Sequence, residues 1–179
     1  MKWEVVNLVM VANTKQIVDL GRFAVIEDVT LRQYSPHGVM VHFKPSSHGP
    51  SVSIFRTGQM NVAGKIDPRE GDKALKDTVR ALTAHGLIKQ VAIKTRIVNI
   101  VVKVNLERQL NIVKLSQQLH NSIYEPELFP GFVHRPSGMH PQAFTMFQSG
   151  KVIIAGINNP KAIKASVDYL AKIADEFGV

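Results

Sequence analysis

The sequence repeats itself, and this duplication limits the fold more than any other feature. When the 179-residue chain is shifted by 92 positions its halves align without a gap, and Val6-Asn7, for example, falls on Val98-Asn99. The shift gives 14 identical pairs among 87, where unrelated sequences of ordinary composition would give about 5. The duplication predicts two similar repeats, residues 1–92 and 93–179, intimately joined in one domain.

One part of this alignment is less secure than the rest. The shift places Val41-His42 on Val133-His134, an identical pair in each half. Between Val25 and Gly38, however, few residues match, and compensating gaps could be hidden there.

Each repeat has the same predicted order of elements, β-α-β4-α, which makes the fold class α+β. The opening strands are rich in β-branched residues, a short amphipathic helix follows, and several short strands lie between Pro, Gly and Ser turns. The closing helices begin with an N-cap residue and a proline at the first helical position. The predicted elements are strands Trp3–Ala12 and Thr95–Val104, helices Gln16–Glu27 and Arg108–Leu119, and closing helices starting at Asp67-Pro68 and Asn159-Pro160.

Two helices per repeat can cover only one face of a sheet, so the other face should meet water. On that face of the opening strands lie Asn7 and Asn99, each between apolar neighbours such as Val9 and Val101. An exposed sheet face with apolar side chains is typical of a binding surface. The alternative is that a partner chain or a long loop covers it.

The composition favours a polyanionic partner over catalysis. The formal net charge is +8, and each half carries +4, with 12 basic against 8 acidic residues in the first and 10 against 6 in the second. A basic surface favours nucleic acid. The chain has no cysteine, which excludes disulfides and thiolate metal sites. We expect no enzyme, no cofactor, no bound metal and no membrane segment, because the chain holds no nucleotide or hydrolase motif and no long apolar run.

A possible exception is a pair of histidines that recurs at the same spacing in both halves. His42 and His48 correspond to His134 and His140 under the 92-residue shift. Five intervening residues on a strand and a turn do not give a standard ligand arrangement, and no carboxylate recurs beside them. We therefore do not expect a metal site.

Three segments of the second half resemble one known family. The segments are Ile97-Val98-Asn99-Ile100-Val101, Tyr124-Glu125-Pro126-Glu127-Leu128-Phe129-Pro130-Gly131 and Phe147-Gln148-Ser149-Gly150-Lys151. They lie in the same order and at the same spacing as in the second repeat of TATA-box-binding proteins, which they resemble, and the first half matches more loosely.

The resemblance implies a fold and a function. The fold would be a pseudo-twofold saddle, a curved antiparallel sheet of about ten strands with four helices on its convex face. Its concave face would enter the minor groove of double-stranded TATA-like promoter DNA, bend the duplex and nucleate assembly of the transcription pre-initiation complex. Within this family, apolar side chains wedge between base steps to kink DNA.

The resemblance also implies roles for individual residues. Asn7 and Asn99 would donate amide hydrogens to base acceptors, with Val9 and Val101 as apolar contacts beside them. The wedges would be Phe55, Phe129 with Pro130, Phe147 and, at the constant shift, His37. The remaining groove residues would be Asn61, Ala63, Ile153 and Ala155, and the phosphate contacts Arg135 and Lys151. Arg56 is expected to be a further phosphate contact because it lies beside Phe55.

Several positions depart from the family pattern. Alanine stands at Ala63 and Ala155 where the family usually has threonine, Asn61 replaces a valine, and His37 replaces a phenylalanine. Ser53 and Thr145 stand where the family tends to have leucine. The groove surface is therefore smaller and more polar than usual, above all in the first repeat, which indicates an altered affinity or promoter preference.

The resemblance implies protein partners as well. The loop with Glu125, Glu127 and Leu128 resembles the stirrup that docks the B-type general transcription factor, through which RNA polymerase machinery would be recruited indirectly. Without DNA, an apolar concave face could pair two copies as a homodimer. The location would be the archaeal cytoplasm, at the nucleoid, or a eukaryotic nucleus. The alternative function is a specialised paralogue, or a protein scaffold of the same fold with weakened DNA binding.

Overall fold

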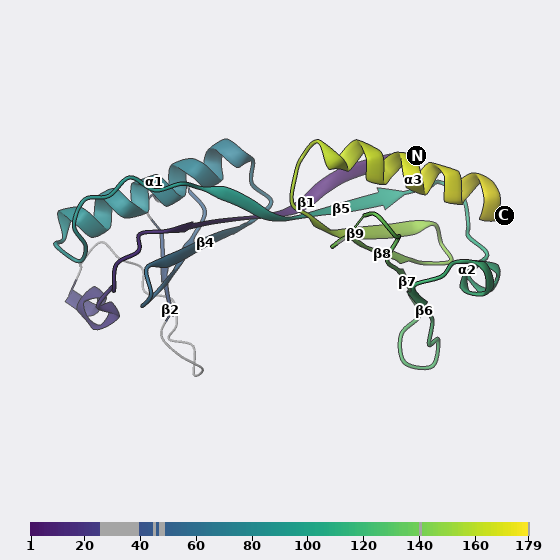
Figure 1. Cartoon of the computed structure of the whole chain (residues 1–179), viewed down its shortest axis with the longest axis horizontal. Helices are drawn as coiled ribbons and strands as arrows, with labels where there is room; N and C mark the ends of the chain where they lie inside the picture. The colour runs from purple at the N-terminus through teal and green to yellow at the C-terminus, as the bar shows by residue number, and fades with distance from the viewer. Residues whose placement is uncertain (26–39, 45, 47–48, 140, 179) are drawn as a thin grey trace. The chain divides into compact units, whose positions relative to one another are not determined.

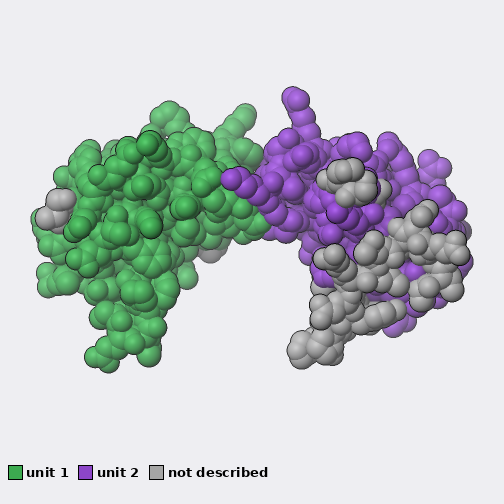
Figure 2. All heavy atoms as spheres, turned by 180° about the vertical axis from the view of Figure 1, so that it is seen from behind, with its two compact units in different colours: residues 1–7, 98–179 green, residues 8–97 purple. Residues whose placement is uncertain are grey.

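A computed structural model describes residues 1–25, 40–44, 46, 49–139 and 141–178. The chain forms two compact units, coloured separately in Figure 2. Unit 1 consists of residues 1–7 and 98–179, and unit 2 of residues 8–97. The first strand, β1, therefore contributes its beginning to unit 1 and the remainder to unit 2. The boundary of the sequence repeat near residue 92 stays a prediction.

Unit 2 is an antiparallel arrangement of strands in the order β2-β3-β4-β1, with a long helix on one face (Figure 1). The helix, α1, packs on β3 and β4 through its buried stripe of apolar residues, among them Leu75, Val79 and Leu82. The elements of this unit are β1 (Lys2–Asn13), the 3-10 helix η1 (Leu20–Val25), β2 (Met40–Phe43), β3 (Val52–Phe55), β4 (Gln59–Gly64) and α1 (Pro68–Ala84).

Unit 1 repeats the plan with the order β5-β9-β8-β7-β6, and α3 packs on β9. Its core is a layer of fully buried side chains that includes Phe132, Phe144, Met146 and Leu170. The elements are β5 (Arg96–Asn105), which begins in unit 2, α2 (Ile112–Gln118), β6 (Ser122–Ile123), β7 (Phe132–His134), β8 (Ala143–Met146), β9 (Lys151–Ile157) and α3 (Ala162–Phe177).

The predicted start of the first closing helix is confirmed. The Asp67 carboxylate accepts hydrogen bonds from the backbone N–H groups of Arg69 and Glu70 at 2.7 and 2.9 Å, and the Glu70 side chain accepts one from Asp67 N–H at 2.9 Å. This reciprocal capping box, with Pro68 at the first helical position, satisfies amide donors that a helix otherwise leaves unpaired.

The start predicted for the second closing helix is wrong by two residues. The Asn159 side chain accepts from Lys161 N–H at 3.0 Å, and the Asn159 carbonyl accepts from Ala162 N–H at 2.9 Å. These bonds close a separate turn, so α3 begins at Ala162 without a side-chain cap. A short polar side chain that bonds its own backbone two residues on favours such a turn.

The two shorter helices also differ from their prediction. In place of a helix over 16–27, the described residues hold the 3-10 helix η1, and residues 26 and 27 lie outside them. The predicted helix 108–119 is shorter, because Asn111 caps its start by accepting from Lys114 N–H at 3.0 Å. The described residues contain nine strands, not about ten.

The pairing of β2 corrects the constant shift between the repeats. Val41 pairs with Ile54 in unit 2, and Phe132 pairs with Met146 in unit 1. Ile54 and Met146 are equivalent at the 92-residue shift, so the equivalent of Val41 is Phe132 and not Val133. At this strand, equivalent residues of the two repeats are therefore 91 positions apart. The identities of Val41-His42 with Val133-His134, found with the 92-residue shift, are coincidental.

This correction bears on the fourth wedge. His37 was assigned by the constant shift, which does not hold at β2, and it lies outside the described residues. Its role stays a prediction. By the corrected count, His42 is equivalent to Val133 and Phe43 to His134.

Candidate nucleic-acid interface

Unit 1 has a sheet face that its helices leave open. Cross-strand pairs join five strands in one row on this face: Ile123, Val133, Thr145, Ile153 and Lys103. All five side chains are half-buried or exposed. We call this surface, with the neighbouring Asn99, Val101, Ala143, Ala155 and Phe147, the open face of unit 1.

The opposite side of the same strands is the core. The neighbouring row joins Phe132, Met146, Val152 and Val104, and all four are fully buried. The expectation that helices cover only one face of the sheet therefore holds in unit 1: one face packs under α3, and the other, lined mostly by apolar and small side chains, is covered by no described element.

The amide of Asn99 has a fixed orientation on the open face. Its Oδ1 accepts a hydrogen bond from the backbone N–H of Gly156 at 2.8 Å. Because a backbone N–H can only donate, the oxygen must face Gly156, and the Nδ2 group is left to donate elsewhere. Val101, two residues on, lies half-buried on the same face. Asn7, the other predicted amide donor, is also half-buried and belongs to unit 1.

The two phenylalanines predicted as wedges in the second repeat lie together. The rings of Phe129 and Phe147 meet edge to face, with centroids 5.9 Å apart and planes inclined by 71°. Phe129 keeps 44% of its surface exposed, and Phe147 is half-buried at the end of β8. Pro130, between Phe129 and the buried Gly131, is exposed.

Unit 2 has its own open face, defined by Val9, His42, Ser53, Phe55, Asn61 and Ala63. Cross-strand pairs place His42 beside Ser53, Ser53 beside Asn61, and Ala63 beside Val9. Phe55 is half-buried at the end of β3 and Ala63 is exposed. The groove residues predicted for the first repeat therefore share one face of unit 2, except Asn7, which belongs to unit 1, and His37, which the structure does not describe.

The open face of unit 2 is more polar than that of unit 1. The Ser53 hydroxyl lies 3.1 Å from His42 Nδ1, and Gln59 Nε2 donates to Asn61 Oδ1 at 3.0 Å. Asn13 Nδ2 in turn donates to Gln59 Oε1 at 3.4 Å. The sequence indicated extra polarity at Ser53 and Asn61, but not the bonds that orient these groups.

The predicted phosphate contacts are exposed cations. Arg56, Arg135 and Lys151 have exposed side chains, and within the part of the chain that the structure describes none of them forms an ion pair. Each is therefore available to a mobile anion. Arg56 follows β3, Arg135 follows β7, and Lys151 begins β9.

A hollow beside Lys151 adds residues that sequence reasoning missed. A cavity of about 320 Å³ in unit 1 is lined by Lys2, Trp3, Lys103 and Lys151, together with Glu4 and Asn105. Trp3 is 49% exposed. The signal for Lys103 was present in the sequence, because it follows Val101 by two residues and so belongs to the same face of β5.

The predicted partner surface is a loop between β6 and β7. In Figure 1 this loop projects from unit 1 away from α3. The backbone N–H groups of Leu128 and Phe129 both donate to the Glu125 carbonyl, at 3.0 and 2.9 Å. This turn presents Leu128 with 83% of its surface exposed, and the Glu125 and Glu127 carboxylates are exposed beside it.

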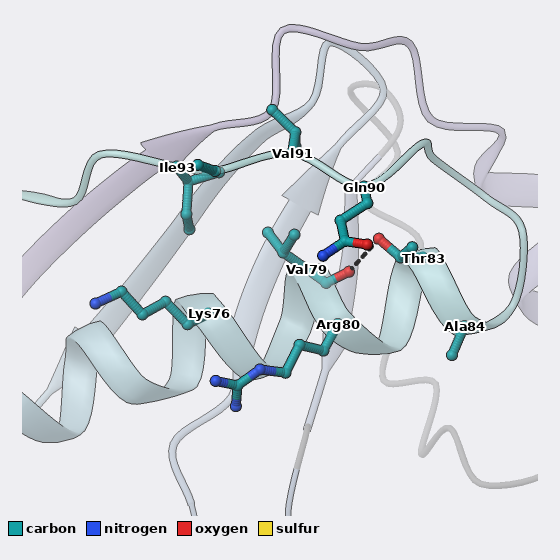
Figure 3. Close-up of a pocket in the computed structure, with 9 residues that line it drawn as sticks. Lys76, Val79, Arg80, Thr83, Ala84, Gln90, Val91 and Ile93 are labelled. Atoms are coloured by element: carbon teal, nitrogen blue, oxygen red, sulfur yellow. Dashed lines mark hydrogen bonds between the residues drawn. The ribbon is translucent and has the colours of Figure 1, made fainter.

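A different hollow lies on the helix side of unit 2. Figure 3 shows it between α1 and the extended segment 90–93, with a volume of about 470 Å³. The two cations on its rim are already paired on α1, Lys76 with Asp72 at 2.7 Å and Arg80 with Asp77 at 2.6 Å. Its walls are otherwise mostly apolar, so it does not suit a polyanion.

The described histidines of the recurring pairs are used in local contacts. His42 Nδ1 lies against Ser53, and His134 Nε2 lies 2.7 Å from the Tyr169 hydroxyl. Among the described residues no three His, Asp or Glu side chains are grouped so as to hold a metal ion, and no helix is long and apolar enough to span a membrane. His48 and His140 lie outside the described residues.

Comparisons with known proteins converge on one family. The model of the family described as transcription factor TFIID (or TATA-binding protein, TBP) matches residues 94–177. The TATA-box-binding protein of Pyrobaculum aerophilum is 30% identical over 181 residues, covering 99% of this chain and 88% of the relative. That of Sulfolobus acidocaldarius is 31% identical over 175 residues, covering 93% of this chain and 86% of the relative.

A solved structure agrees in fold. The structure of Methanococcus jannaschii TBP matches with a TM-score of 0.80 and 25% identity, covering 98% of this chain and 99% of that one. This likeness confirms the predicted fold class.

Proposed function

Because the chain belongs to the TATA-binding protein family, we propose that it binds TATA-like promoter DNA and nucleates the transcription pre-initiation complex. The family description names a transcription factor and not an enzyme. The open faces of the two units are the DNA-binding surfaces. They contact the floor of the minor groove, where A·T and T·A pairs present nearly the same acceptors.

The observation that carries the proposal is the orientation of Asn99. Its Oδ1 is held by Gly156 N–H at 2.8 Å, so its Nδ2 is left to donate to another group. Adenine N3 and thymine O2, the minor-groove acceptors of A·T pairs, are the matching partners. Val101 lies next to this donor as an apolar contact, and a positively charged protein supplies the long-range attraction.

The Phe129–Phe147 pair is the device for deforming DNA. Two partly exposed rings in edge-to-face contact form a firm apolar wedge. Inserting such a wedge between base steps costs a few kcal/mol of stacking, which wider contact with the bent duplex offsets; TATA-binding proteins are the standard case of this mechanism. Phe55 of unit 2 has the equivalent position to Phe147.

The loop between β6 and β7 is the docking site for the B-type general transcription factor. Its exposed Leu128 offers an apolar anchor, and Glu125 and Glu127 give the loop a negative charge. A basic patch on the partner would match this surface. RNA polymerase is then recruited through that factor.

The proposal is tested by titrating the protein against two duplexes that differ only in the central element, one TATA-containing and one with G·C pairs throughout. Fluorescent labels at the duplex ends report bending by energy transfer. Both titrations are run over a salt series, because affinity for DNA is interpretable only at a stated salt concentration. We expect selective binding to the TATA duplex with a sharp bend.

Weak, unbent and strongly salt-dependent binding to both duplexes would contradict this function. That result would support a scaffold of the same fold that holds DNA only through its charge. If the protein bound the TATA duplex selectively but left it straight, minor-groove recognition would still be supported. Phe129 and Phe147 would then not be wedges.

A further inference from the structure

The two open faces differ at equivalent positions on their central row. At three positions of this row, unit 1 has an apolar or β-branched side chain where unit 2 has a stronger hydrogen-bonding group or a smaller one, whereas Lys103 of unit 1 is equivalent to the apolar Val11 of unit 2. The equivalent pairs are Val133 with His42, Thr145 with Ser53, and Ile153 with Asn61.

Asn61 is the member of this row with the most specific chemistry. It is half-buried on β4, with Ser53 opposite it on β3 and Val11 opposite it on β1. Its Oδ1 accepts from Gln59 Nε2 at 3.0 Å, and Gln59 Oε1 accepts from Asn13 Nδ2 at 3.4 Å. Among the described residues the Nδ2 group of Asn61 has no hydrogen-bond partner, so it ends this chain of amides.

The Asn61 amide matches one base edge in the minor groove. A guanine presents a donor, its N2 amino group, beside an acceptor, N3, whereas A·T pairs present acceptors only. A side-chain amide has the reverse arrangement, an oxygen acceptor beside an N–H donor. The carbonyl oxygen of Asn61 has a second lone pair besides the one that Gln59 uses, so it can accept from the guanine amino group while Nδ2 donates to N3.

Asn99 does not offer the same match. Its oxygen is bonded to a backbone N–H, that of Gly156, which cannot rotate away. The oxygen of Asn61 is bonded to a side chain, and Gln59 is itself only half-buried. In unit 1 the side chain equivalent to Asn61 is Ile153, which fills the groove floor without any partner for a guanine amino group.

On the basis of the proposed function, we propose that the protein recognises an asymmetric site. Unit 2 selects a half-site that contains a G·C pair, through the amide of Asn61, and unit 1 requires A·T pairs throughout its half. Ser53 and His42 line the same row and surround the guanine with polar groups. The asymmetry orients the protein on its promoter by sequence.

The inference is tested with the full chain and a set of duplexes in which a single G·C pair is moved through an otherwise A·T element. Binding is measured at one fixed salt concentration, and each Kd is divided by that for the all-A·T duplex. We expect a G·C pair to be favoured at a position in one half only. The matched variants exchange the equivalent residues: Asn61→Val removes the amide from unit 2, and Ile153→Asn introduces one in unit 1.

Asn61→Val should reduce the preference for that G·C pair by about tenfold, the order expected for losing one bidentate base contact. Ile153→Asn should raise tolerance of G·C in the other half. The inference would be overturned if wild type and Asn61→Val gave the same Kd ratios, or if a G·C pair weakened binding equally in both halves of the site. In either case, selective binding to the all-A·T duplex would still support the proposed function. Failure of the wild type to bind the all-A·T duplex selectively would instead contradict the function itself.

Discussion

Phe129 and Phe147 contact each other edge to face although they lie 18 positions apart in sequence. Gly131 makes the contact possible. A Cβ atom at this position would overlap Cε1 of Phe129 and lie 3.1 Å from Cε1 of Phe147. The pair is therefore built jointly by the end of β8 and the loop that precedes β7, and each ring limits the movement of the other.

Phe147→Ala should weaken binding to TATA DNA by a few kcal/mol and reduce the bend, because the wedge loses one ring and the remaining ring loses its support. End-labelled duplexes in an energy-transfer titration measure both quantities. Phe129→Ala and the double variant complete a cycle, and the contact predicts effects that do not add. An unchanged bend in Phe147→Ala would exclude this residue from the wedge.

Asn99→Asp should abolish selective DNA binding while leaving the fold nearly as stable. The carboxylate keeps an oxygen for Gly156 N–H, but it replaces the outward Nδ2 donor by a negative charge that faces base acceptors. Asn99→Ala is the contrasting variant, since it loses both groups and leaves the Gly156 amide without its partner, at about 1–3 kcal/mol of stability. Urea unfolding and DNA titration separate the two. If Asn99→Asp still binds TATA DNA as well as wild type, the donor role is wrong.

Lys151→Gln should make the plot of log K against log salt concentration less steep by about 0.9, because each phosphate contact releases about that many counterions. The loss should be similar for every duplex sequence, since phosphate contacts carry no base information. Arg80→Gln serves as the control: this cation lies on α1 and is paired with Asp77 at 2.6 Å. An equal slope in Lys151→Gln and wild type would remove Lys151 from the interface.

Glu127→Arg should prevent recruitment of the B-type factor and leave the bend angle of bound DNA unchanged. The substitution reverses the charge of an exposed loop whose backbone is held by hydrogen bonds to the Glu125 carbonyl, so the loop itself should persist. A gel-shift assay with DNA and the purified factor measures recruitment. Glu176→Arg, at the exposed end of α3, is the matched charge control. Lost DNA bending in Glu127→Arg would show that the loop is not a separate partner site.

Local patterns in the sequence predicted the faces of the sheet. The wedge assignment placed Phe55 and Phe147 on the open side, and the neighbouring Ile54 and Met146 lie in the core, as the alternation along β3 and β8 requires. The N-cap at Asp67 with Pro68 was equally legible, although the same pattern at Asn159 closes a turn and not a helix. Such features depend on neighbours within a few residues, where periodicity and capping chemistry are specific.

Features that depend on pairing between distant residues were not predicted. The displacement of 91 residues at β2 is visible only from its partners on β3, because Val41-His42 and Val133-His134 agree by chance at 92. A one-residue change of register moves every side chain to the other face. The 92-residue shift made His42 and His134 equivalent, but the true register places His42 on an open face and His134 in a core.

The core position of His134 has an energetic consequence. Its ring stacks between Phe132 and Tyr169, with centroids 6.2 and 6.0 Å away, and Nε2 lies 2.7 Å from the Tyr169 hydroxyl. Burial lowers the pKa of His134 below its usual 6.5, opposed in part by the nearby carbonyls of His120 and Asn121. Burial also raises the pKa of Tyr169, so the pair is neutral around pH 7.

His134→Phe should flatten the dependence of stability on pH in the acid range. In the wild type the unfolded chain binds a proton at His134 as the pH falls through about 6.5, before the folded protein can, so the free energy of unfolding decreases from there down to the lowered pKa of the folded state. Phenylalanine suits the site, since Phe43 is its buried equivalent in unit 2. Urea unfolding at pH 7.5, 6.5 and 5.5 measures how the free energy of unfolding changes with pH. The difference between variant and wild type at pH 7.5 separately reports the cost of leaving the Tyr169 hydroxyl unpaired.

His85→Phe, at an exposed helix end, controls for removing a histidine as such. If His134→Phe loses stability toward pH 5.5 as steeply as wild type, the acid sensitivity belongs to other groups and His134 does not titrate as its burial requires.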